Sequence, residues 1–217
     1  MMASMTATVS RATDPSTMSA TERRIVDAAL RLFVAKGTTD LTVSELAAEA
    51  DVARGTLYRY LDSMETLFDR VVAHFGAELH QRVSDSFDSI DDPATRLATG
   101  VRMWIRYAHD NPGMGRFAVT YGQTAETLRG VLAGPTMHDL ETGFASGRFM
   151  SDASMVPSIA ALIIGATISA MWMVLEGHQT WREAGAATAE LLLRALGVEP
   201  AEAHEISRIP LPDLRPA

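Results

Sequence analysis

Two short helices in immediate succession constrain this chain more than any other feature of its sequence. Thr42 and Glu45 have the spacing of a capping box, which predicts the start of a helix over residues 43–50. That helix has room for only two turns before the three residues 51–53, after which the segment RGTLYRYL predicts another helix from residue 54. Two short helices joined by a tight turn are typical of a helix-turn-helix, here at about residues 42–62.

A longer helix is predicted on each side of this pair. Ser19 and Glu22 form a second capping box, and Gly37 fits the position after a helix end that favours a left-handed backbone. Ser63 is a candidate cap for a helix over residues 64–87. Apolar residues between the first two signals recur with the period of one buried helix face: Ile25, Ala28, Ala29, Leu32 and Phe33.

The remaining sequence also predicts helices, with a stop at Asn111-Pro112 and a break near Gly134-Pro135. No segment alternates as a strand does, so we expect an all-α fold. A flexible, polar tail (1–18) is expected before a three-helix helix-turn-helix domain (19–79). A second helical domain (80–198) and a loosely packed, proline-rich tail (199–217) follow.

The second short helix carries side chains that suit the major groove of DNA. Arg54 has the two donors that read a guanine edge, and Gly55 lets the start of the helix approach the bases closely. Other residues of this segment offer a base-edge contact, phosphate contacts and a second positive charge: Thr56, Tyr58, Tyr60 and Arg59. A solvated surface helix with ordinary arginines and tyrosines is the simpler reading of these residues taken alone.

The net charge of −8 argues at first against a nucleic-acid partner. Residues 19–64 carry six basic and seven acidic side chains, so the helix-turn-helix region is itself slightly acidic. The stretch 52–61, however, contains two arginines and no acid. The local charge of the second short helix therefore supports the DNA hypothesis, whereas the charge of the region as a whole does not.

The N-terminal region resembles the TetR family of bacterial transcriptional regulators over about 50 continuous residues. The resemblance implies a homodimer that binds a palindromic operator in double-stranded DNA, with Thr42 joining residues 54–60 among the DNA contacts. It also implies that residues 80–198 bind a ligand and dimerise. The matching residues are Ile25, Ala28, Ala29, Leu32, Phe33, Gly37, Thr42, Val43, Leu46, Ala47, Ala50, Val52, Gly55, Thr56, Leu57, Tyr58, Ser63, Glu65 and Leu67.

The sequence departs from the family pattern at three positions. Asp51 stands where the family usually has glycine, at a turn position that favours a positive φ angle. Ala53 replaces the usual serine that caps the second short helix. Met64 replaces a common lysine, which removes one phosphate contact. We therefore expect weaker nonspecific DNA binding than in a relative that carries the lysine.

Residues 153–175 contain no charge and are long enough to cross a bilayer. Pro157, several polar residues and the lack of flanking basic clusters favour a buried helix instead. The resemblance implies that the last two helices of the second domain form the dimer interface, which suits this segment and residues 184–196. A soluble or membrane-associated helical protein without a DNA-binding role is the alternative.

An effector pocket in the second domain is inferred from an unusual supply of aromatic and methionine residues. Such side chains line pockets for large apolar ligands, although each of them also suits ordinary core packing. We expect a repressor that a small, largely apolar ligand releases from its operator. The candidate lining residues are Met103, Trp104, Tyr107, Phe117, Tyr121, Met137, Glu141 and Trp172.

Other chemistry finds no support in the sequence. Cysteine is absent, which excludes a disulfide framework and a thiolate metal site and suits the cytoplasm. No catalytic triad, metal or phosphate-loop pattern stands out, so we expect no enzyme activity, cofactor or metal. His74 and Glu78 have a helical i, i+4 spacing but are expected to be exposed.

Overall fold

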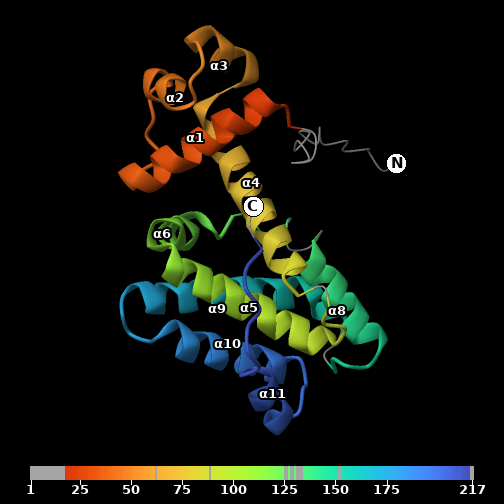
Figure 1. Ribbon diagram of the computed structural model, residues 1–217. Coiled ribbons are helices and arrows are strands. Elements are labelled where there is room, and N and C mark those ends of the chain that lie inside the picture. The colour runs from red at the N-terminus through yellow and green to blue at the C-terminus, as the bar shows by residue number, and fades with distance from the viewer. Residues whose placement is uncertain are drawn as a thin grey trace, which may run out of the picture.

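The computed structural model describes residues 18–61, 63–87, 89–124, 127, 130, 134–150 and 153–215. Within these residues the secondary structure is helical and contains no strand, which confirms the predicted all-α class. Figure 1 shows a small group of helices at one end of the molecule, joined by one long helix to a larger helical bundle.

The small group consists of α1 (Ala20–Lys36), α2 (Val43–Glu49) and α3 (Arg54–Tyr60). Both predicted capping boxes form, from Ser19 to Glu22 and from Thr42 to Glu45. Gly37 ends α1 with a φ angle of 66°, a left-handed conformation that costs glycine little. The helix-turn-helix prediction is thus confirmed to within a residue or two at each end.

The long helix α4 (Met64–Asp85) begins at its Ser63 cap and leads away from α3 into the larger bundle (Figure 1). It runs straight across the boundary expected at residues 79 and 80. Its buried apolar residues from Leu67 to Val83 belong to the same core as those of α1 and α2, and this core also includes Phe87, Met103 and Phe117. The two regions therefore share packing along α4.

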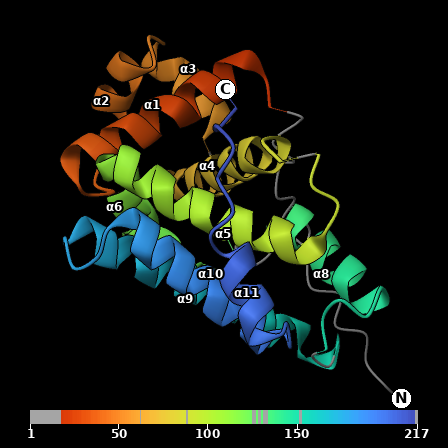
Figure 2. The ribbon, with the colours of Figure 1, turned by 60° about the horizontal axis from the view of Figure 1, so that its bottom comes forward.

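The larger bundle is built around α5 (Pro93–Asp110), which packs against α9 (Val156–Leu175) and α10 (Trp181–Ala195). Figure 2 shows these helices stacked in layers below α4. Two shorter helices, α6 (Pro112–Tyr121) and α8 (Pro135–Ala145), begin at the two predicted proline breaks. Proline suits the first turn of a helix, where no backbone donor is needed.

The C-terminal segment differs from the loosely packed tail that the sequence suggested. Pro200 opens a further helix, α11 (Pro200–Ile206), whose Ala203 and Ile206 are buried in the core of the bundle. The chain then runs back along the molecule to α4, where the Arg215 amide donates to the Ser86 hydroxyl at 2.9 Å. Its prolines prevent a longer helix but do not prevent packing, because Leu211 and Leu214 lie against the core shared with α4.

Helix α9 is apolar enough and long enough to cross a membrane, by its length and composition alone. One third of its most apolar window is buried within the chain. Its outward side carries Leu162, 48% exposed, and Trp172, 46% exposed, beside small residues. Neighbouring α10 exposes Leu191 to 64%. The two helices together thus leave apolar surface uncovered by this chain.

Candidate DNA interface and interior cavity

The exposed side of α3 carries the basic and aromatic side chains predicted for DNA contact. Arg54, Tyr58 and Arg59 are exposed, and Tyr58 reaches 70%. Leu57 alone turns fully inward from α3 and anchors the helix in the core. Within the described residues, neither arginine has a hydrogen bond or an ion pair to another side chain, so both are free to meet an external anion.

Gly55 meets no atom within 4 Å at the position where a Cβ would stand. The packing of the chain itself therefore does not require glycine here. A glycine that the interior does not need, on an exposed helix start flanked by arginines, fits the close approach of another molecule.

The other three predicted DNA contacts are less accessible. Thr56 and Tyr60 are half-buried, and Tyr60 packs against the core of α1 and α4. The Thr42 hydroxyl already takes part in its capping box, accepting from the Glu45 amide at 3.2 Å. A contact from Thr42 to phosphate therefore has to share the hydroxyl with the cap.

The turn between α2 and α3 is held by a residue that the sequence did not single out. Arg24 of α1 donates to the carbonyl oxygens of Ala50 and Asp51 at 2.8 and 2.7 Å. Asp51 has a φ angle of 52°, as its place in the family pattern suggested, and it is the one described non-glycine residue with positive φ. Since positive φ is costly for most side chains, the Arg24 bonds offset part of that cost.

Several acidic side chains of this region form ion pairs with cations other than those of α3. Ion pairs join Glu45 to Lys36 at 2.8 Å and Glu49 to Arg31 at 2.7 Å, and Arg70 pairs with Glu22. Hydrogen bonds from Lys36 and Thr42 lower the pKa of Glu45 to about 2. The net charge of residues 19–64 therefore counts acids that are already paired with other cations. Arg54 and Arg59 of α3 have no such partner among the described residues, so the acidic total does not argue against DNA binding by α3.

The start of α3 lacks a side-chain cap, as the alanine at position 53 implied. Ala53 occupies the N-cap position in an extended conformation and makes no capping hydrogen bond. The first amides of α3 consequently stay available to water or to a phosphate oxygen, and the helix dipole favours an anion at this end.

A cavity of about 130 Å³ lies between α4, α5, α6, α8 and α9. Most of its wall is apolar, with aromatic rings from three helices. Helix α4 forms one side of it from Val72 to Ser84, and Phe87 just after the helix extends that side. The other lining residues are Arg96, Leu97, Gly100, Val101, Trp104, Phe117, Ala118, Tyr121, Gly122, Thr127, Pro135, Thr136, Asp139, Ile163, Ile164, Thr167, Ile168 and Met171.

Three polar groups give the cavity its chemistry. Arg96 donates through Nε to Asp139 Oδ1 at 2.6 Å. Burial raises the pKa of Asp139, and the neighbouring guanidinium opposes that rise. Burial also lowers the pKa of His80, so its ring is neutral and offers one donor and one acceptor. His80 Nε2 lies 3.3 Å from the Thr136 hydroxyl.

The predicted effector residues divide into two groups. Trp104, Phe117 and Tyr121 line the cavity. The other five lie elsewhere. Met103 and Tyr107 pack in the core shared with α4, and Met137 is half-buried on α8. Glu141 and Trp172 are exposed.

Sequence reasoning missed the polar lining residues His80, Arg96 and Asp139. Arg96 and Asp139 are 43 positions apart, so only the packing of α5 on α8 brings them together. A charged residue in an amphipathic helix normally faces water, and nothing local distinguishes these two from solvated ones.

A chain of aromatic rings connects the cavity with the helix-turn-helix region. Phe117 of the cavity wall stacks on Phe33 of α1, with centroids 6.3 Å apart and planes 5° from parallel. Phe75 of α4 meets Phe117 edge-on at 5.9 Å. Rings from α1, α4 and α6 therefore form one continuous set of contacts between the cavity wall and the helix-turn-helix region.

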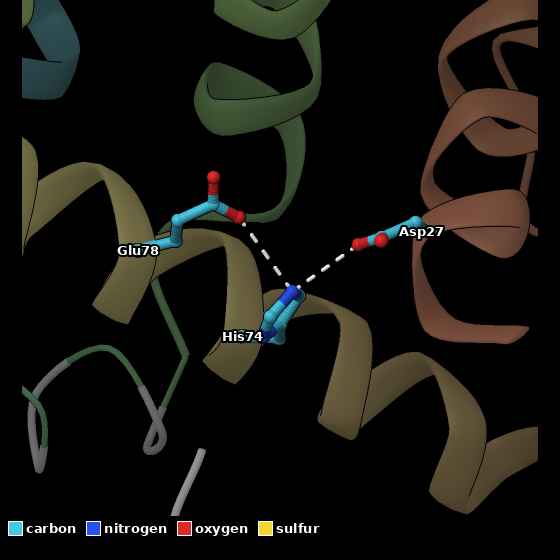
Figure 3. A group of neighbouring side chains, drawn as sticks. All are labelled: Asp27, His74 and Glu78. Carbon is cyan, nitrogen blue, oxygen red and sulfur yellow. Dashed lines mark hydrogen bonds and ion pairs between the residues drawn. The ribbon is translucent and has the colours of Figure 1, made fainter. Parts of the chain in front are cut away.

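The expectation that His74 is exposed was wrong. Its residue is 7% exposed, and its Nε2 lies 3.2 Å from Asp27 Oδ1 of α1 (Figure 3). The i, i+4 spacing with Glu78 located both residues on one side of α4, but the buried contact depends on α1, which is remote in sequence.

Fold and site together define a helix-turn-helix protein with an attached helical domain that encloses a cavity. The chain matches two family models: "Bacterial regulatory proteins, tetR family" over residues 25–71, and "Tetracyclin repressor-like, C-terminal domain" over residues 92–209. These matches cover most of the chain, which therefore belongs to the TetR family. The family consists of transcription regulators and not of enzymes.

Individual relatives agree with this assignment. An uncharacterized HTH-type transcriptional regulator of Mycobacterium tuberculosis is 33% identical over 115 residues, which are 51% of this chain and 54% of that protein. The match thus spans about half the length of that curated relative. A structure of RolR in complex with resorcinol superposes with a TM-score of 0.74 at 26% identity, covering 90% of this chain and 96% of RolR. Bacillus subtilis FadR with stearoyl-CoA shares the fold, with a TM-score of 0.64 at 19% identity over 79% of this chain and 97% of FadR.

Proposed function

We propose that the protein is a homodimeric transcriptional repressor that a small, largely apolar ligand releases from a palindromic operator. The observation that carries this proposal is the double role of α4. Its buried apolar residues from Leu67 to Val83 pack in the core shared with the helix-turn-helix region, and its residues from Val72 to Ser84 also form a wall of the cavity. A ligand that reshapes the cavity therefore acts directly on the helix that positions α3.

DNA binding is assigned to the exposed side of α3. Arg54 lies at the start of the helix, where it suits a base edge in the major groove, and Arg59 and Tyr58 suit phosphate oxygens. A single helix of seven residues covers few base pairs. Two copies, related by the two-fold axis of a dimer, read two half-sites about one helical turn or more apart.

The dimer is assigned to α9 and α10. Leu162 and Trp172 of α9 and Leu191 of α10 are exposed large apolar side chains on the uncovered side of the bundle. These are the last two helices within the predicted second domain (80–198), and α11 follows them in the chain. A partner copy that covers these side chains explains why a helix as apolar as α9 occurs in a soluble, cytoplasmic protein, and no membrane is required to cover it.

The cavity favours an effector of one aromatic ring with hydroxyl groups. An apolar cavity of about 150 Å³ accommodates benzene in another protein, so the 130 Å³ available here suit a ligand of similar size. Asp139 and neutral His80 accept hydrogen bonds, and the rings of Trp104 and Phe117 offer flat apolar contact. The structural neighbour RolR carries resorcinol, a dihydroxybenzene, whereas the stearoyl-CoA of FadR needs a much larger space.

Release follows from a difference in affinity between two states. A ligand that binds better when Phe117 is displaced favours that arrangement, and the stacked Phe33 carries the displacement into α1. The two α3 helices of the dimer then leave the spacing of their half-sites. DNA affinity falls by the factor by which the ligand prefers the displaced state.

Electrophoretic mobility shift with DNA from beside the protein's own gene tests the proposal. We expect retardation at low salt that weakens steeply as salt increases, and release of the DNA by resorcinol or a related dihydroxybenzene. Absence of retardation at every protein concentration contradicts the DNA assignment. Retardation that no single-ring phenol relieves, together with release by long-chain acyl-CoA, contradicts the effector assignment alone.

A charge in the uncovered apolar surface tests the dimer separately. Leu191→Glu places a carboxylate where a partner copy is expected, and sedimentation measures the resulting oligomer. We expect monomers and at least a tenfold loss of operator affinity, because the two half-sites are then bound independently. Arg116→Glu, a charge change at an exposed position of α6, serves as the matched control and leaves the dimer intact.

A further inference from the structure

Three side chains that can bind a metal ion meet where α1 crosses α4 (Figure 3). His74 and Glu78 lie on consecutive turns of α4, and Asp27 reaches them from α1. His74 Nε2 is 3.2 Å from Asp27 Oδ1 and 3.6 Å from Glu78 Oε2, and the three atoms all lie within 4.8 Å of one another. None of the three residues belongs to α3 or to the cavity lining.

The surroundings of the three side chains differ in a way that suits entry of an ion. The His74 side chain is 9% exposed and directs Nε2 between the two carboxylates. The side chains of Asp27 and Glu78 are 39% and 47% exposed. A fixed, buried nitrogen and two carboxylates open to water leave a path from solvent and room for water as a further ligand.

Hydrogen bonds within the protein satisfy these three side chains only in part. A proton on Nε2 reaches Asp27, whereas the 3.6 Å to Glu78 exceeds a hydrogen bond. The two carboxylates face one nitrogen, and their like charges repel each other. His74 Nδ1 is buried and has no partner among the described residues.

We propose that Asp27, His74 and Glu78 bind a divalent transition-metal ion of the Zn²⁺ type. Zinc bonds of about 2.0–2.1 Å to nitrogen and oxygen in tetrahedral geometry place neighbouring ligand atoms about 3.3 Å apart. The separations of 3.2 and 3.6 Å from Nε2 fit two edges of such a tetrahedron. Two carboxylates also balance the charge of a divalent ion, and imidazole selects zinc-like ions over magnesium.

The unpartnered Nδ1 predicts how tightly the site binds. An ion on Nε2 requires the ring proton to sit on Nδ1, where no acceptor is present among the described residues. Loss of that outer hydrogen bond lowers metal affinity by about 10- to 100-fold relative to a fully supported site. The site therefore exchanges its ion with the surroundings and does not hold it permanently.

The position of the site gives the ion an effect on the fold. Arg70 of α4 already pairs with Glu22 of α1, about one turn away on each helix. A bound ion adds a second link between the same two helices. Because α1 packs against α2, which packs against α3, and α4 forms a wall of the cavity, metal binding stiffens the junction between the two regions.

Calorimetric titration of the chelator-treated full chain with ZnCl₂ tests the proposal. We expect one Zn²⁺ per chain, and at least a tenfold loss of affinity in Glu78→Gln and in Asp27→Asn. Both carboxylates are partly exposed, so these variants are expected to fold. The matched control is His204→Gln, which removes a surface histidine 3.1 Å from Glu190 and leaves binding unchanged.

A thermal melt provides the second measurement. Zn²⁺ at about 100 times its dissociation constant is expected to raise the Tm of the wild type by about 5–10 °C, and to have no such effect on Glu78→Gln. No binding, equal binding by Mg²⁺, or binding lost in His204→Gln and kept in Glu78→Gln overturns the site. The last outcome identifies adventitious binding at the surface only.

Discussion

The arginines of α3 and the arginine of the cavity wall are held in opposite ways. Arg54 and Arg59 of α3 are exposed and, within the described part of the chain, bond to no other side chain. Arg96 of the cavity is tied to Asp139, to the Ile90 carbonyl at 3.1 Å and to the face of Phe87 at 5.0 Å. The unpaired arginines therefore suit the external partner that we propose, whereas the side chain of Arg96 already has its partners inside the chain.

The largest effect that this comparison predicts is on stability. Arg96→Ala leaves the carboxylate of Asp139, 6% exposed, without its cation, and removing one partner of a buried pair is costly. We expect the free energy of unfolding to fall by about 3 kcal/mol, measured by urea denaturation. Arg54→Ala, which breaks no internal contact, is expected to stay within about 0.5 kcal/mol of wild type.

Equal losses in these two variants would falsify the contrast between free and paired arginines. Arg96→Ala with Asp139→Asn is the refinement. Because the double variant leaves no unpaired buried charge, it is expected to recover part of the lost stability.

The second effect is on operator affinity, and here Arg54→Ala is expected to lose more than Arg96→Ala. Arg54→Ala is expected to cost about 1–3 kcal/mol of operator affinity and to relax specificity at one base pair. Fluorescence anisotropy with operator and scrambled duplexes measures both. Arg116→Ala, which removes an exposed arginine from α6, is the matched control, and an equal loss there reduces the effect to general charge.

The helix-turn-helix was predictable because its signals are local. Capping boxes at Ser19 and Thr42 and the helix-ending Gly37 each depend on residues within a few positions of one another. The family pattern also predicted the positive φ angle of Asp51. What escaped prediction here was the support from Arg24, because that contact spans 26 positions of the chain.

The cavity was predictable only in part because its walls come from five helices. Aromatic residues could be named as candidates, and three of them line it, but helical period alone does not say which face of a short helix turns inward. Trp172 illustrates the failure: Met171 beside it lines the cavity, whereas Trp172 faces outward. The same limit hid Asp139, which is polar and buried.

Two glycines differ in the same way, because internal packing requires one of them and does not require the other. A Cβ at Gly143 of α8 overlaps the Phe149 ring, so Gly143→Ala is expected to cost about 1–3 kcal/mol of stability through overpacking. Gly55→Ala meets no atom within 4 Å and is expected to add about 0.5 kcal/mol through helix propensity. Thermal denaturation separates the two cases. Mobility shift adds the decisive measurement, because a more stable Gly55→Ala that binds operator less tightly locates the close approach at this residue.

The smallest effect concerns the uncapped start of α3. Ala53→Ser supplies an oxygen for the free amides of the first turn, and a serine cap is worth about 1 kcal/mol over alanine. We expect the variant to unfold at slightly higher urea and, because α3 is better ordered, to bind operator somewhat more tightly. Met64→Lys at the first residue of α4 is the partner variant. It is expected to leave stability unchanged, to tighten binding to operator and scrambled DNA alike, and to steepen the salt dependence by about one contact. If Ala53→Ser stabilises the protein but weakens DNA binding, the free amides themselves contact phosphate, and the anion site at the start of α3 rests on the backbone and not on Arg54.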